Sequence, residues 1–158
     1  MKDQPHVQNY LLALLQDLDG IQQNPQFHPE GDALFHSLQV FQIALQESTD
    51  PILLAAALFH DVGKSVNSKN HDKTGADMLR GILDDQVIWL IEHHLDLLKH
   101  PGKTRQKLKQ DKRLHDLEKL RKWDLAGRDP FADTLSTEQA LSILLEFTKP
   151  ETKSLQKP

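Results

Sequence analysis

Residues 51–64 read PILLAAALFHDVGK. Residues 52–59 are apolar without a break, and such a segment is typical of a helix that is buried on most of its faces. Asp50 in front of Pro51 is a strong start signal for this helix, because aspartate caps free amides and proline fits the first helical position. The segment ends in His60 and Asp61, and burying an imidazole or a carboxylate costs free energy unless the group is paired or ligated. The sequence therefore predicts a core helix that ends in chemically active groups.

Apolar residues recur at spacings of three and four along the rest of the chain, and glycine and proline fall where this periodicity breaks. No segment keeps the period-two alternation of a strand. These patterns predict an all-α domain, a bundle of about six to eight helices. Besides the core helix, we expect helices over 7–18, 33–45, 71–83, 86–98 and 114–125, and one after the capping box of Ser136 and Gln139. The first ends before Gly20, and Asp32 caps the second. Asp84 or Asp85 caps the helix over 86–98, and His100–Pro101–Gly102 breaks it.

The chain has 158 residues, with 19 basic and 23 acidic side chains, nine histidines and no cysteine. Its length favours one domain, which we expect to span residues 1–149, with the motifs between 27 and 129 and a polar tail over 150–158. The absence of cysteine excludes disulfides, zinc ribbons, iron–sulfur clusters and thiol nucleophiles. The formal net charge of −4 excludes a dedicated polycationic duplex binder. No segment approaches the roughly 18 apolar residues that span a bilayer, so we expect a cytoplasmic protein without a membrane segment.

Histidine and aspartate form an ordered series on the expected helices. The series comprises His36, His60, Asp61, His71, His93, His94 and Asp124. A single histidine on an apolar helix face is more often a core residue with a hydrogen-bond partner than a ligand. Histidines from four different helices are harder to explain by packing, and imidazole together with carboxylate is a ligand set for divalent transition metals. The series therefore predicts a metal site that several helices assemble.

The order of these residues resembles the HD-domain superfamily of metal-dependent phosphohydrolases, whose pattern is a histidine, a His-Asp dyad and a distant aspartate. Here the pattern falls on His36, His60-Asp61 and Asp124, and the dyad with Val62, Gly63 and Lys64 is similar to the common His-Asp-Ile-Gly-Lys form. The local motifs are most similar to the HD domain of bacterial CCA-adding enzymes, over residues 27–129. The nucleotidyltransferase core of those enzymes has no room in 158 residues, so we expect a stand-alone HD domain without tRNA end-repair activity.

The resemblance implies a site for one or two metal ions. The two histidines and two aspartates of the motif would hold the first ion, and Asp61 would bridge to a second ion held by His71 and by His93 or His94. Consecutive helical residues point about 100° apart, and the resemblance favours His93 as the ligand, with His94 beside it or on a further ion. This ligand set suits manganese, iron, nickel, cobalt or zinc better than magnesium. Two ions about 3.5–4 Å apart would bridge a hydroxide that attacks phosphorus.

Cationic residues after the motifs are candidates for phosphate binding. Lys64 lies one turn after the dyad, where its ammonium would either meet a phosphate oxygen or complement a helix C-terminus. Lys64 and Asp61 are the expected catalytic residues, and Arg128 is a second candidate for binding phosphate. The segment Lys99–Lys122 holds ten basic and three acidic residues, which indicates either a solvated face or a surface that draws a phosphorylated substrate to the site.

Three polar residues lie in the loop before His36. The resemblance puts this loop at the mouth of the site, where Glu30 would contact the substrate, a water molecule or a metal ion, and His28 would contact the substrate. Asp32 is better explained as the cap of the following helix.

Three functions are compatible with this sequence. The resemblance favours a metal-dependent phosphohydrolase for a phosphomonoester or phosphodiester, with a nucleotide or a cyclic phosphate as the substrate. Mixed-valent diiron oxygenases of the HD type use the same ligand series, and a non-catalytic module that senses a nucleotide or binds a partner is the third alternative. The net charge does not indicate nucleic acid as a partner, and no motif encodes the substrate, the metal or the oligomeric state.

Overall fold

The computed structural model describes residues 4–148. Their helices are α1 Gln4–Gln16, α2 Ala33–Glu47, α3 Pro51–Phe59, the 3-10 helix η1 Val62–Ser65, α4 His71–Leu79, α5 Asp85–His93, α6 Asp96–Lys99, α7 Pro101–Lys107, α8 Lys112–Ala126 and α9 Thr137–Thr148. The only β pairing in this part of the chain is a single bridge between Gln22 and Asp32. The predicted all-α fold is confirmed, whereas the predicted tail over 150–158 lies outside the described residues. None of the described helices is both long and apolar enough to cross a membrane.

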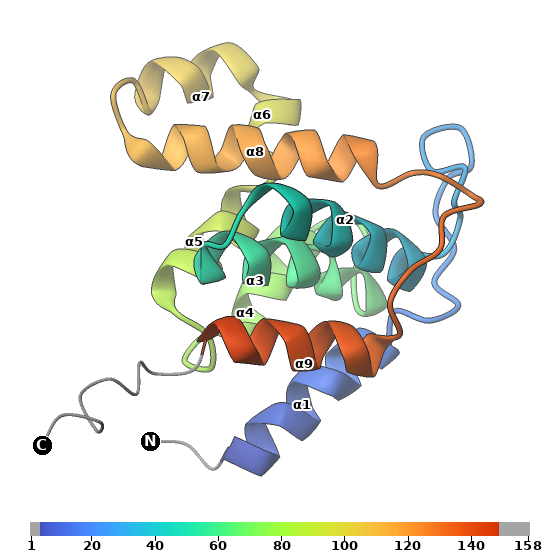
Figure 1. The fold of residues 1–158 in the computed structure, drawn as a ribbon. Coiled ribbons are helices and arrows are strands. Elements are labelled where there is room, and N and C mark those ends of the chain that lie inside the picture. The colour runs from blue at the N-terminus through green and yellow to red at the C-terminus, as the bar shows by residue number, and fades with distance from the viewer. Residues whose placement is uncertain (1–3, 149–158) are drawn as a thin grey trace, which may run out of the picture.

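Helix α3 is the centre of the bundle, as its sequence predicts. Asp50 caps this helix, and its Oδ1 atom accepts a hydrogen bond from the amide of Ile52 at 2.9 Å. Every residue from Leu53 to Phe59 is buried, and α3 packs against α2, α5, α8 and α9. Figure 1 shows α8 on one side of α2 and α3, and α9 on the other. The end of α3 and the His60 side chain that follows it therefore lie in the interior.

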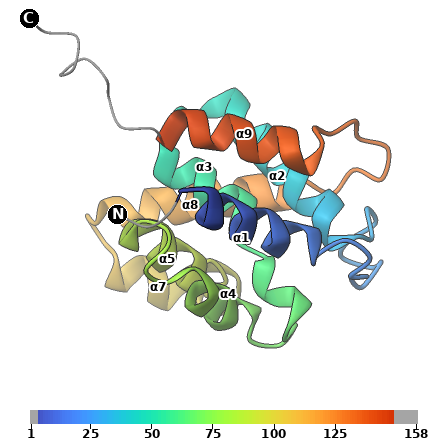
Figure 2. The ribbon, with the colours of Figure 1, turned by 90° about the horizontal axis from the view of Figure 1, so that it is seen from below.

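The remaining helices enclose this centre from several sides. Helix α1 packs on α9, and the two lie side by side in Figure 2. Helix α4 packs against α5 and η1, while α6 contacts α7 and α8. The loop between α1 and α2 meets the C-terminal end of α8 at one edge of the bundle (Figure 1), where Arg128 Nη1 donates to the carbonyl of Phe27 at 2.8 Å. Residues that are distant in the sequence thus meet at the same end of the bundle.

The predicted helix caps are confirmed. Asp32 Oδ2 accepts from the amide of Phe35 at 2.9 Å, and Asp84 Oδ1 accepts from an amide at the start of α5 at 2.8 Å. At the start of α9, Ser136 Oγ accepts from the amide of Gln139 at 3.1 Å, and Gln139 Oε1 accepts from the amide of Ser136 at 2.9 Å. These side chains satisfy amides that have no partner within their own helix.

Helix α4 is shorter than the range 71–83 that the sequence pattern predicts. It ends at Leu79, whose carbonyl accepts from the amides of Ile82 at 2.9 Å and Leu83 at 3.1 Å in a turn. Gly81 has a φ of +79° in this turn. This left-handed conformation favours glycine and ends the helix.

The helix predicted over 86–98 is divided into α5 and the single-turn helix α6. The division follows His93, because the Nδ1 atom of His94 donates to the carbonyl of Ile91 at 2.6 Å and competes with backbone amides for this acceptor. The predicted break at 100–102 is confirmed at His100, which has a non-helical backbone between the end of α6 and the start of α7 at Pro101. Proline suits the first position of a helix, because an N–H at this position would find no acceptor within the helix.

Candidate metal centre

Six side chains from five segments gather inside the bundle. They are His36 of α2, His60 and Asp61 directly after α3, His71 at the start of α4, His94 directly after α5, and Asp124 of α8. All six residues are buried. Polar groups of this kind are stable in a protein interior only if they are paired or bind a ligand. Their mutual distances divide them into two clusters that share Asp61.

The first cluster consists of His36, His60, Asp124 and the Oδ2 atom of Asp61. His36 Nε2 lies 2.8 Å from Asp124 Oδ1 and 3.7 Å from Asp61 Oδ2. His60 Nε2 lies 3.3 Å from Asp61 Oδ2 and 3.5 Å from Asp124 Oδ1. His36, His60 and Asp124 form a group that could hold a metal ion, and Asp61 Oδ2 lies within 3.7 Å of both histidine nitrogens, where it could be a further ligand.

The second cluster consists of His71, His94 and the other carboxylate oxygen of Asp61. Asp61 Oδ1 lies 3.2 Å from His71 Nε2 and 3.6 Å from His94 Nε2. The two histidine nitrogens are 3.2 Å apart. This group also could hold a metal ion, and Asp61 faces both clusters with one oxygen each.

The histidines of both clusters are held in the same way. In each ring the Nδ1 atom contacts a backbone carbonyl, which fixes the proton on Nδ1 of a neutral ring and leaves the Nε2 lone pair for a ligand. The pairs are His36 with Gly127 at 2.8 Å, His60 with Ala57 at 2.9 Å, His71 with Ser68 at 3.0 Å and His94 with Ile91 at 2.6 Å. The Nε2 atom of His60 is buried without a hydrogen-bond partner. The donor set, the ring orientation and this unpartnered nitrogen all fit a divalent metal ion.

The first cluster also favours positive charge. Burial lowers the pKa of His60, but the charge of Asp61 and the contact with Asp124 outweigh burial and raise the pKa to about 10. Burial raises the pKa of Asp61, yet the charges of His60 and Lys64 hold it well below its usual value. The pKa of Asp124 is likewise well below its usual value, because the contacts with His36 and His60 outweigh burial. The carboxylates therefore remain ionised and attract a cation.

Gly63 brings the second cluster together. A Cβ atom on this residue would overlap the carbonyl oxygen of His71 and lie 2.7 Å from the amide nitrogen of Gly75. Helix η1 can therefore approach the start of α4 only with glycine here. This close approach puts His71 within reach of Asp61.

Comparison with known families agrees with this geometry. The family described as HD domain matches residues 34–129 of the chain, a range that contains both clusters. The chain belongs to the HD-domain family. The predicted resemblance is thereby confirmed, and the HD domain indicates the superfamily of metal-dependent phosphohydrolases.

Curated relatives of this HD domain carry the name Multifunctional CCA protein. The protein of Hahella chejuensis is 33% identical over 86 residues, which are 50% of this chain and 20% of the relative. The protein of Thioalkalivibrio sulfidiphilus is 31% identical over 81 residues, 47% of this chain and 20% of the relative. That of Methylococcus capsulatus is 32% identical over 81 residues, 47% of this chain and 19% of the relative. The match thus spans about a fifth of the length of these relatives.

The HD domain includes His94 and not His93 in its second cluster. His93 Nδ1 donates to Asp96 Oδ2 at 2.8 Å, and its ring stacks on Trp89 with the centroids 4.3 Å apart. His94 is buried, and burial lowers its pKa, which favours the neutral ring that a metal requires. The resemblance favours His93 as the ligand, whereas the geometry brings His94 beside Asp61 and His71, and we propose His94 as the ligand of the second cluster.

Glu30 and His28 lie behind the first cluster of the HD domain. Glu30 Oε2 is 2.7 Å from His36 Nδ1 and 3.0 Å from His28 Nδ1. These atoms are on the opposite edge of the His36 ring from the cluster, and the Glu30 side chain has no exposed surface (0%). The predicted contact of Glu30 and His28 with a substrate stays a prediction. Together with His36, these two residues form a third group that could hold a metal ion. We propose that Glu30 orients His36, as acidic groups behind metal-binding histidines commonly do.

Lys64 and Arg128 reach the carboxylates of the first cluster. Lys64 Nζ lies 3.1 Å from Asp61 Oδ2, and Arg128 Nη2 lies 3.8 Å from Asp124 Oδ1. Lys64 also donates to Gln23 Oε1, and the Nε2 atom of Gln23 is buried without a partner. Gln23 is not recognisable from the sequence as a neighbour of the site, because no pattern distinguishes it from Gln22 or Gln26 in the same polar loop.

Proposed function

We propose that this HD domain is a phosphohydrolase that binds two divalent metal ions and cleaves a phosphomonoester or phosphodiester, with a nucleotide or a cyclic phosphate as its substrate. The observation that carries the proposal is the orientation of Asp61, whose two oxygens face two separate groups of histidines. A carboxylate in this position suits two cations that share one ligand. The match to the HD-domain family supports the same assignment.

The ligand set supports a transition metal. His36, His60, Asp61 and Asp124 would hold the first ion, and Asp61, His71 and His94 would hold the second. Imidazole nitrogen suits manganese, iron, nickel, cobalt or zinc better than magnesium, which prefers oxygen ligands. When bound, such ions polarise a phosphoryl oxygen and make water a stronger nucleophile near neutral pH.

Lys64 gives the site a positive charge. Its ammonium lies 3.1 Å from Asp61 Oδ2, and its side chain is 13% exposed, so it stands between the buried cluster and the surface. Metal ions bound beside Asp61 would balance the negative charge of its carboxylate, which would free Lys64 to pair with another anion. We assign Lys64 to donate a charge-assisted hydrogen bond to an oxygen of the bound phosphate ester. Arg128 would add positive charge beside Asp124.

The proposal is tested by metal analysis together with a panel of phosphate esters. The protein is loaded anaerobically with each metal in turn, and hydrolysis of nucleotides, cyclic nucleotides and simple phosphomonoesters is measured. We expect metal-dependent release of phosphate or opening of the cyclic ester. Asp61→Asn should abolish turnover and lower the metal content, because it removes the shared ligand.

Asp116→Asn is the matched control for Asp61→Asn. Asp116 is also a buried aspartate, but it pairs with Lys112 at 2.8 Å and lies outside both clusters. We expect this control to retain metal and activity. Absence of turnover on every ester, or substrate-dependent consumption of dioxygen by the iron form, would contradict the proposal and favour the binding module or the oxygenase.

A further inference from the structure

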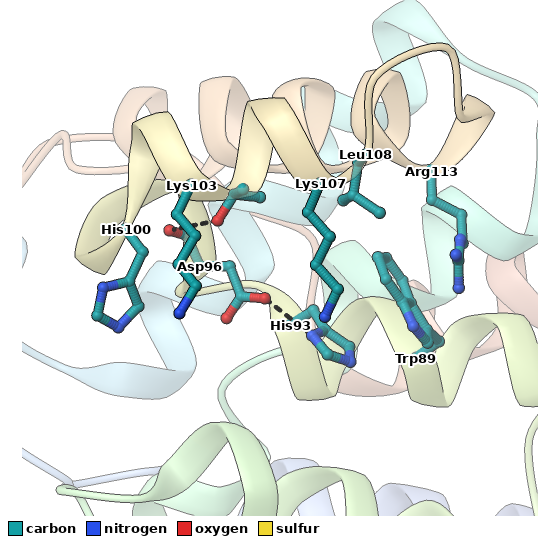
Figure 3. Close-up of a pocket in the computed structure, with 9 residues that line it drawn as sticks. Trp89, His93, Asp96, His100, Lys103, Lys107, Leu108 and Arg113 are labelled. Atoms are coloured by element: carbon teal, nitrogen blue, oxygen red, sulfur yellow. Dashed lines mark hydrogen bonds and ion pairs between the residues drawn. The ribbon is translucent and has the colours of Figure 1, made fainter.

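A pocket lies between α5, α6, α7 and the start of α8 (Figure 3). Its volume is about 350 Å³, within the range of small-molecule binding sites. The residues that matter for its chemistry are Trp89, His93, Asp96, Lys103, Lys107 and Arg113. None of the six cluster residues lines it. The pocket is therefore separate from the candidate metal centre.

Three flat groups on one side of this pocket form a stack, with Trp89 between His93 and Arg113 (Figure 3). The ring of His93 stacks on Trp89 at 26° with centroids 4.3 Å apart, and Arg113 Cζ lies 4.3 Å from the Trp89 ring. Asp111 holds the guanidinium in place, since its Oδ2 accepts from Arg113 Nη2 at 2.8 Å. The stack is thus ordered before any ligand binds, and planar π-systems with a guanidinium are the surfaces on which nucleobases pack.

The opposite side of the pocket carries positive charge. Lys103 and Lys107 extend from α7 towards α5 in Figure 3, and neither has an ion pair among the described residues. Asp96 is the one acidic residue that lines the pocket, and its Oδ2 atom accepts from His93. The segment Lys99–Lys122, which supplies both lysines, holds ten basic and three acidic residues. Free ammonium groups in a basic surface of this kind attract phosphate.

We propose that this pocket binds a nucleoside phosphate at a site distinct from the metal centre. Lys103 and Lys107 would donate to the phosphate oxygens. The base would pack on the outer face of His93 or of the Arg113 guanidinium, because these two groups cover the two faces of the Trp89 ring. The ligand chemistry is the same in a free nucleotide and at the end of a single-stranded RNA. The proposal does not depend on the proposed hydrolysis, because none of these residues belongs to the metal clusters.

The test uses the full chain kept metal-free with a chelator, so that the metal centre does not bind phosphate. Binding of adenosine monophosphate, of a short single-stranded oligoadenylate and of inorganic phosphate is measured by calorimetry and by the shift of the Trp89 indole N–H signal in NMR spectra. The pocket variant is Lys103→Gln with Lys107→Gln. Its matched control is Lys109→Gln with Lys119→Gln, which removes the same charge from exposed residues outside the pocket.

We expect adenosine monophosphate or the oligoadenylate to bind saturably and to shift the Trp89 signal. The pocket variant should weaken binding by about tenfold or more, because two charge-assisted hydrogen bonds are lost, while the control changes it less than about twofold. Tighter binding of the oligoadenylate than of the mononucleotide would identify RNA as the source of the ligand. No saturable binding of either probe, an equal loss in the control, or equal binding of inorganic phosphate would overturn the proposal.

Discussion

The imidazole rings of His93 and His94 point to different parts of the molecule, although the two residues are adjacent in the sequence. His94 Nε2 lies 3.6 Å from Asp61 Oδ1 inside the second cluster. His93 donates to Asp96 and stacks on Trp89 in the neighbouring pocket. This divergence follows from helix geometry, since successive side chains point about 100° apart. The end of α5 therefore supplies one histidine to each site.

Replacing each of these histidines separately tests the assignment. We expect His94→Ala to lower the metal content from about two equivalents per chain to about one, because the second ion would keep only two protein ligands. His93→Ala should retain both equivalents, since its ring lies outside the clusters. The measurement is elemental analysis of protein dialysed against metal-free buffer. Loss of metal from His93→Ala with retention in His94→Ala would reverse the assignment.

The sequence predicts the first cluster better than the second for a physical reason. Helix periodicity puts His36 on an apolar helix face. The end of the apolar core helix makes His60 and Asp61 recognisable. The choice between His93 and His94 depends on where α5 ends, and that end is set by the His94 ring itself, which takes the Ile91 carbonyl. Local periodicity contains no information on such a contact.

The positions of loop residues are the least predictable from the sequence. The resemblance puts Glu30 at the mouth of the site, whereas the fold turns its carboxylate to the back of His36. Gln23 reaches Lys64 across 41 positions of the sequence. Both outcomes depend on how the loop between α1 and α2 packs against other segments, and no spacing within the loop encodes that packing.

Substitution of Gly63 should disturb both stability and the second cluster. Gly63→Ala introduces a Cβ against the backbone of His71 and Gly75, so we expect a loss of about 1–3 kcal/mol in the free energy of unfolding. Gly102→Ala is the control, because a Cβ at Gly102 meets nothing within 4 Å and alanine is favoured in a helix. Urea denaturation of the metal-free proteins measures both changes. Equal stability of the two variants would show that η1 can move away from α4 without cost.

Glu30 should affect metal affinity without touching the metal. Glu30→Gln keeps the size of the side chain but removes the charge 2.7 Å from His36 Nδ1, so we expect metal affinity to fall by about tenfold or more. Competition with a coloured chelator measures this affinity. Glu118→Gln, a change of the same kind on α8 outside the clusters, should leave it unchanged. Unaltered affinity in Glu30→Gln would limit Glu30 to a packing role.

Glu47 links the end of α2 to the buried Trp123 and should make stability depend on pH. Its Oε1 atom accepts from Trp123 Nε1 at 3.0 Å and from Lys122 Nζ at 3.1 Å, and these contacts lower the pKa of Glu47. A carboxylate whose pKa is lower in the folded state stabilises the protein above its unfolded-state pKa, and this contribution is lost as the pH falls through the folded-state value.

Glu47→Gln separates the charge of Glu47 from its hydrogen bond to Trp123, because the amide oxygen still accepts from the indole N–H. We expect the original protein to lose more stability than Glu47→Gln as the pH falls below about 4.5, because the unfolded chain takes up the Glu47 proton there while the folded protein takes it up only at a lower pH. Urea denaturation with a chelator present measures this difference without a contribution from bound metal. Glu138→Gln, an exposed change on α9, should follow the original protein. If the free energy of unfolding had the same pH dependence in the original protein and in Glu47→Gln, the lowered pKa of Glu47 would be contradicted. The charge of Glu47 would then add nothing to its hydrogen bond with Trp123.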